Sequence, residues 1–153
     1  MNRTQCIAQH LYDTGQVMVA VSLIVQKSAS EWAIVFDNQD ELTVTFDGDL
    51  GMLNFVSPIG KLPAEADADL LKLLLLANGG FEQSGGVQLA LGENNQILQI
   101  LRVPEHIEEH HWLQIIEDQR EKVAFWRNTL CEFSGAMAQS QTATVHADEF
   151  LKV

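Results

Sequence analysis

Basic residues are scarce in this sequence. Its 153 residues include 9 Lys and Arg against 21 Asp and Glu, which gives a formal net charge of −12. Nucleic acids and anionic membranes repel a protein of this charge, so we expect neither as a partner. The charge instead favours solubility and the attraction of a basic partner.

Cysteines and long apolar runs are also few. Cys6 and Cys131 share no metal-binding spacing, so we expect two free thiols in a reducing compartment. The apolar run 73–77 is far shorter than the roughly 20 residues of a membrane-spanning helix. The N-terminal residues lack the charged and then apolar pattern of a secretory signal. We therefore predict a soluble, intracellular protein of one domain, as suits a chain of this length.

The first half of the sequence predicts one helix and three strands. Residues 3–14 form an amphipathic pattern, with Ile7 and Leu11 one helical turn apart, and Gly15 is expected to end this helix. The stretch 17–25 is apolar and β-branched, and its periodicity does not decide between strand and helix. Three alternating stretches between residues 32 and 58, separated by acidic turns, predict an antiparallel meander.

A leucine-rich helix opens the second half. Residues 70–77 are apolar almost all round and are followed by Asn78-Gly79, which is typical of a helix end. A surface helix normally has one apolar stripe, so this helix must be covered on more than one side, and a second copy of the chain is a natural cover. Two further strands, 86–91 and 96–103, are joined by the turn-forming residues 92–95.

The last predicted helix begins at Pro104. Its apolar positions recur every three or four residues and form one stripe along the helix. The polar residue Gln119 occupies one position of this stripe, and the apolar positions are Trp112, Ile116, Val123, Trp126, Leu130 and Phe133. Residues 134–153 lose this pattern, and we predict a mobile C-terminal tail. The order of elements is α-β-β-β-α-β-β-α, which predicts an α+β fold with an antiparallel sheet in residues 1–133.

One motif suggests metal chemistry. His106-Ile107-Glu108-Glu109-His110 matches the H-x-x-E-H pattern of zinc peptidases, and a helix would place His106 and His110 one turn apart. No third ligand is assigned, so a solvated helix start is the favoured interpretation, and a small zinc hydrolase is the alternative. No other catalytic constellation is found, and we expect no enzyme activity, no metal and no cofactor.

The apolar side chains exceed what one small core should need. They lie on the predicted strands and on the leucine-rich helix, and they either all pack inside the domain or bind another polypeptide, because exposed apolar patches usually mark interfaces.

Several stretches together resemble a known family. They are the strands from Trp32 to Phe55 with their acidic turns, the closing Ser57-Pro58-Ile59-Gly60, the leucine-rich helix, and the two strands that follow it. In these features the chain is similar to the class I type III secretion chaperones, the Tir chaperone family. It departs from their pattern at 15–30, where the family passes quickly from the first helix to the first strand.

The resemblance implies a bacterial, cytoplasmic homodimer without enzyme activity. Such a chaperone binds the N-terminal chaperone-binding segment of a secreted effector, or a small regulatory protein, and keeps it soluble and competent for secretion. The resemblance assigns the dimer interface to Leu71, Leu74 and Leu75. It assigns effector binding to Ile7, Leu11, Ile34, Phe36, Phe46 and Phe55. A dimeric adaptor module remains a further alternative.

Overall fold

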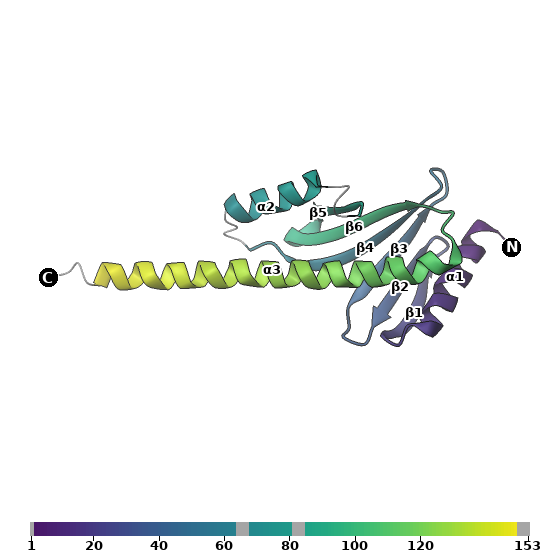
Figure 1. Cartoon of the computed structure of the whole chain (residues 1–153), viewed down its shortest axis with the longest axis horizontal. Coiled ribbons are helices and arrows are strands. Elements are labelled where there is room, and N and C mark those ends of the chain that lie inside the picture. The colour runs from purple at the N-terminus through teal and green to yellow at the C-terminus, as the bar shows by residue number, and fades with distance from the viewer. Residues whose placement is uncertain (1, 64–67, 81–84, 150–153) are drawn as a thin grey trace.

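The computed structural model describes residues 2–63, 68–80 and 85–149, and their side chains as far as residue 134. The chain forms α1 (Arg3–Val17), β1 (Val21–Ser28), β2 (Glu31–Phe36), β3 (Glu41–Asp47), β4 (Met52–Lys61), α2 (Ala68–Gly79), β5 (Val87–Leu91), the short 3₁₀ turn η1 (Glu93–Asn95), β6 (Gln96–Pro104) and α3 (Glu109–Glu149) (Figure 1). The predicted α+β class is confirmed, with one strand more than predicted. No helix in the described part of the chain could span a membrane.

The six strands in the described residues form one antiparallel sheet in the order β1-β2-β3-β4-β6-β5. Because side chains alternate between the two faces of a strand, the strand register defines two rows across the sheet. One row consists of Gln26, Trp32, Val44, Phe55, Leu101 and Val87, and all of them except Gln26 are buried. The neighbouring row on the opposite face consists of Val25, Ala33, Thr43, Val56, Ile100 and Gln88.

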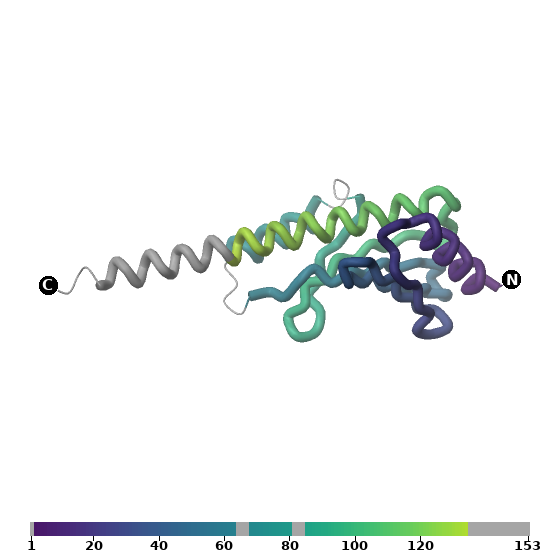
Figure 2. Tube along the Cα trace, turned by 90° about the horizontal axis from the view of Figure 1, so that it is seen from below, coloured from purple at the N-terminus to yellow at the C-terminus, as the bar shows by residue number. Residues whose placement is uncertain are grey.

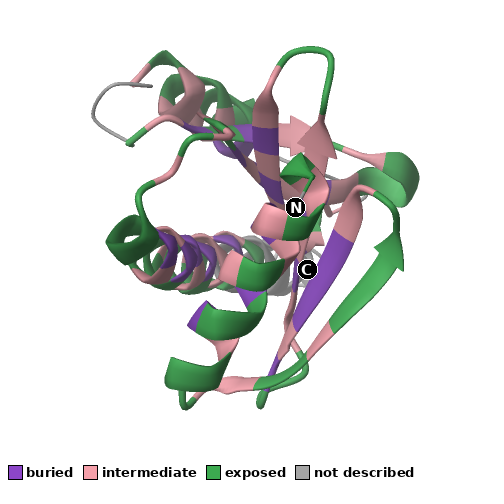
Figure 3. Cartoon of the chain, turned by 90° about the vertical axis from the view of Figure 1, so that its right-hand side faces the viewer, coloured by how far each residue is buried: buried purple, intermediate pink, exposed green. Residues whose placement is uncertain are grey.

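Helices α1, α2 and α3 all lie on the face of the first row, as the view along the molecule shows (Figure 3). Helices α1 and α3 bury Ile7, Leu11 and Trp112 against the middle of the sheet. At the other end, α2 buries Leu70 against Leu89 of the edge strand β5. Helix α3 runs along the sheet from α1 to α2 (Figures 1 and 2).

The first helix does not end at Gly15, as the sequence predicted, but continues to Val17. A Cβ atom added to Gly15 would lie 2.4 Å from Cδ1 of Ile24, so the absence of a side chain lets α1 pack closely on β1. The undecided stretch 17–25 is therefore divided between the end of α1 and the edge strand β1.

The last helix begins later and ends later than predicted. Pro104 pairs with Met52 and ends β6, and the N–H of Glu105 donates to the carbonyl of Gly51, so α3 starts only at Glu109. The predicted stripe is confirmed where it meets the core, because Trp112, Ile116, Gln119, Val123 and Leu130 are buried. Residues 134–149 continue the helix, and the mobility predicted for 134–153 stays a prediction.

Candidate functional site

Helix α2 presents leucines to solvent beside the edge of the sheet. The side chains of Leu75 and Leu76 are 71% and 73% exposed, and Leu71 is also exposed. A groove of about 280 Å³ separates this helix from the end of the sheet; we call it the leucine groove, and it is lined by Leu62, Leu71, Leu74, Leu75, Asn78, Leu89, Ala90, Leu91 and Ile97. The three residues predicted for a dimer interface, Leu71, Leu74 and Leu75, all line it.

The polar residue Asn78 holds α2 in this position. Its side-chain amide donates to the carbonyl of Leu89 over 2.8 Å, and its side-chain oxygen accepts from the N–H of Leu89 over 2.7 Å. Because β5 is an edge strand, Asn78 takes the place of a neighbouring strand at Leu89. The sequence predicted Asn78 only as a helix end and gave no sign of this contact.

A second apolar surface lies on the sheet face that no described helix covers. We call it the open sheet face, and it is formed by Leu23, Val25, Val35, Val56, Leu98 and Ile100. Leu23 is 53% exposed and Val25 is also exposed, whereas the other four are half-buried among their neighbours. The sequence analysis missed these residues because it selected the larger aromatic side chains of the same strands.

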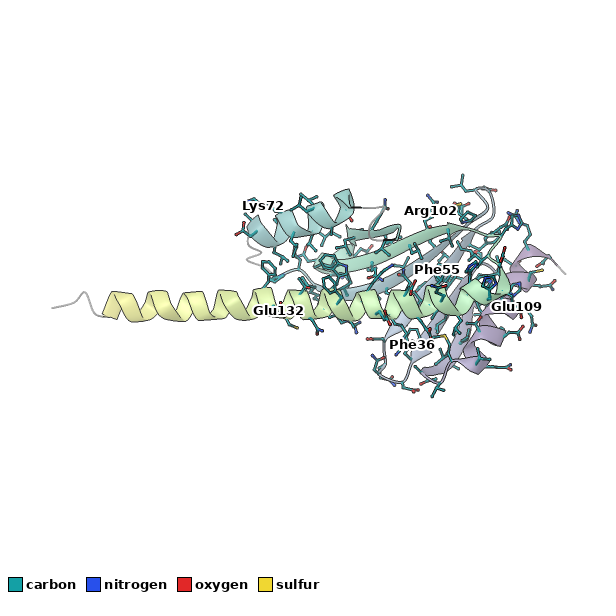
Figure 4. The ribbon with its side chains drawn as sticks, in the orientation of Figure 1. Phe36, Phe55, Lys72, Arg102, Glu109 and Glu132 are labelled. Carbon is teal, nitrogen blue, oxygen red and sulfur yellow. The ribbon has the colours of Figure 1, made fainter. Side chains whose placement is uncertain are left out.

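Most side chains predicted to bind an effector lie in the core instead of on the surface. Ile7, Leu11, Ile34, Phe36 and Phe55 are buried between the sheet and helices α1 and α3, and the two phenylalanines can be followed beside α3 in Figure 4. The sixth, Phe46, is half-buried, and the centroid of its ring lies 5.0 Å from the guanidinium carbon of Arg3. The five buried side chains could contact a partner only if α1 or α3 moved, and their assignment stays a prediction.

An ion pair closes the end of the sheet where α1 begins. Arg3 pairs with Glu105, and it also donates to the carbonyl of Gly48 over 3.1 Å. The hydrogen bond to Arg3 is the main cause of the lowered pKa of Glu105, and it likewise raises the pKa of Arg3; partial burial opposes both shifts. These contacts join α1, the β3–β4 turn and the segment before α3.

The H-x-x-E-H motif does not form the expected zinc site. His106 lies before the start of α3, its side chain is 93% exposed, and its Nε2 is 3.8 Å from Glu105. Only Glu109 and His110 of the motif are helical, so the prediction that His106 and His110 stand one turn apart on a helix is wrong. The cause is Pro104, which ends a strand instead of starting a helix.

Solved structures match this arrangement, whereas no protein family model and no curated protein does. A chain of the ExsC–ExsE complex matches over 85% of this chain and 97% of its own length, with 11% identity and a TM-score of 0.69. A chain of the HopA1–SchA chaperone–effector complex matches over 82% and 95%, with 16% identity and a TM-score of 0.65. A chain from the Yersinia pestis type III secretion chaperone SycH in complex with a stable fragment of YscM2 matches over 81% and 98%, with 13% identity and a TM-score of 0.60.

The chain has the type III secretion chaperone fold. Each match covers more than four-fifths of this chain, so the likeness extends over most of the chain and is not limited to one or two elements. The leucine groove and the open sheet face are two separate apolar surfaces of this chain.

Proposed function

We propose that this protein is a cytoplasmic bacterial chaperone of type III secretion. It acts as a homodimer without enzyme activity, and it binds the N-terminal chaperone-binding segment of a secreted effector, or a small regulatory protein. Binding keeps that partner soluble and competent for secretion. The fold supports this function, and three neighbours of similar fold were solved as complexes, one of them described as a chaperone–effector complex.

The observation that carries the proposal is the presence of two apolar surfaces with different positions. The leucine groove lies at the β5 end of the sheet, and we assign it, with Leu71, Leu74 and Leu75, to the contact between two copies. The open sheet face reaches the opposite edge at β1, and it stays free for a partner after dimerisation through α2. A module that only dimerises needs the first surface and not the second.

The charge of the chain suits a partner segment that is basic and apolar. The net charge of −12 attracts Lys and Arg. Glu31 lies on the same side of the sheet as Val35, whereas Glu41 on that side is already paired with Lys27. An unfolded segment orders when it binds, and it gains free energy by placing alternate side chains against an apolar sheet face.

The test is to purify the tagged protein from its native host, identify the protein that comes with it, and weigh the complex by light scattering. We expect two copies of the chain with one partner, bound through the N-terminal region of that partner. A variant with Val25→Glu and Ile100→Glu on the open sheet face should remain dimeric and lose at least tenfold in affinity for the same partner. The matched control is Asn128→Glu on an exposed position of α3.

Two results would contradict parts of the proposal. Unchanged partner affinity in the open-face variant, with the circular dichroism spectrum of the wild type, would remove the open sheet face from partner binding. A dimer that retains no partner in any purification would favour the adaptor module.

A further inference from the structure

A cluster of two imidazoles and one carboxylate lies at the start of α3, away from both apolar surfaces. Glu108, His110 and His111 are exposed, and one ligand atom from each comes within 4.8 Å of the others. The Nδ1 atom of His110 is 3.6 Å from Oε2 of Glu108, and the two imidazole ring centroids are 3.9 Å apart. Among the described residues, this is the group whose geometry suits a metal ion.

The backbone around the cluster is anchored on both sides. The N–H of His111 donates to the carbonyl of Glu108 over 2.9 Å, so one tight turn brings the three side chains together. Ile107, just before the cluster, packs against the hydrophobic core, and Trp112, just after it, is 1% exposed. The side chains are therefore carried by a fixed backbone, with Glu109 beside them at the start of α3 (Figure 4).

The donor set selects the class of metal. Two imidazole nitrogens and one carboxylate oxygen are ligands that zinc binds well, whereas calcium and magnesium take oxygen ligands alone. Three protein ligands leave a fourth position for water or for another ligand. There is room for one, since Glu108 and His111 also line a hollow of about 370 Å³.

Electrostatics act in both directions at this position. The positive end of α3 disfavours a cation in its first turn. The carboxylates of Glu108 and Glu109 and the net charge of −12 oppose that effect. We propose that Glu108, His110 and His111 bind one zinc ion per chain. This site lies apart from the leucine groove, and it differs from the His106/His110 pair that the sequence motif suggested.

The test uses the untagged full chain after removal of metals with a chelator, titrated with zinc chloride in a calorimeter. We expect one zinc per chain and a zinc-dependent rise in Tm. His110→Ala and His111→Ala should each weaken zinc binding at least tenfold, and Glu108→Gln should weaken it severalfold. His106→Ala is the matched control, because His106 is exposed and belongs to the same segment. It should leave the affinity unchanged.

Each other result overturns the proposal. Loss of binding in His106→Ala with normal binding in His111→Ala would restore the motif pair. Equal weak binding by all variants, or no zinc at one equivalent, would show that the cluster is no site. All four side chains are exposed, so their replacement should not unfold the chain, and circular dichroism checks this.

Discussion

Arg127 is the residue whose removal should most clearly weaken α3. Its guanidinium donates to the carbonyls of Pro58 and Ile59, each over 3.0 Å, and pairs with Asp40 in the β2–β3 turn. The two carbonyls lie at an irregularity of β4, where the pairing with β6 shifts between Pro58 and Gly60. Replacement Arg127→Met should lower the free energy of unfolding by about 2 kcal/mol, since several partly buried bonds to a charged group are lost. Urea denaturation of both proteins measures this.

The control is the pH dependence of the difference in free energy of unfolding between the wild type and Arg127→Met. Burial raises the pKa of Asp40, but the hydrogen bond and charge of Arg127 outweigh it, so the pKa of Asp40 is lowered overall. A carboxyl whose pKa is lowered by folding stabilises the folded state at pH values above its pKa in the unfolded chain, which is about 3.9 for Asp. This stabilisation is lost as the pH falls through the lower pKa that Asp40 has in the folded state. The difference between wild type and Arg127→Met should therefore narrow below about pH 4. A constant difference would mean that Asp40 has no part in it.

The buried pair of Gln99 and Gln119 shows which features of a residue the sequence predicts and which it does not. The helical spacing correctly placed Gln119 on the buried stripe of α3, because a period of 3.6 residues is local information. Its partner could not be predicted. Gln99 donates from Nε2 to the side-chain oxygen of Gln119 over 2.7 Å, and this contact depends on how α3 crosses β6.

At the scale of elements, Asn78 should decide whether α2 stays on β5. Asn78→Ala removes both bonds to the backbone of Leu89 and leaves that edge of β5 without its partner side chain. We expect the free energy of local unfolding of α2 and β5 to fall by about 2 kcal/mol. Hydrogen exchange should rise in these two elements and stay unchanged in β2 and β3. Gln88→Ala, an exposed side chain on the same strand, is the control, and an equal effect there would contradict the role of Asn78.

Element boundaries were predicted well where the sequence carries turn residues. The turn at 92–95 is one case, since Asn94 and Asn95 adopt left-handed conformations with φ of 53° and 58°. Boundaries failed where tertiary contacts decide. Gly15 ends no helix because it packs against Ile24, and Pro104 starts none because it pairs with Met52. At these two positions, proline and glycine failed to predict a helix boundary because each contacts a neighbouring strand.

At the scale of the whole molecule, sequence predicted the sheet but not which face stays free. Alternation in Trp32, Ile34 and Phe36 marks one face, and Ala33 and Val35 on the other face are also apolar. Local sequence does not specify on which side the helices pack, because both faces could accept them. The structure places the three described helices on the aromatic face, and no described helix covers the apolar side chains of the open sheet face.

The oligomeric state provides the whole-molecule prediction. Leu75 is largely exposed on α2 and lines the leucine groove, so a second copy would bury it. Wild-type protein should have twice the 17.0 kDa mass of one chain by light scattering, and Leu75→Glu should have the mass of one chain. A carboxylate buried without a partner costs several kcal/mol, so Leu75→Glu should strongly weaken a contact made through the leucine groove. Ala68→Glu, on the same helix but outside the groove, should stay dimeric. If both variants remain dimers, the two copies meet elsewhere, and the open sheet face becomes the next candidate for the contact.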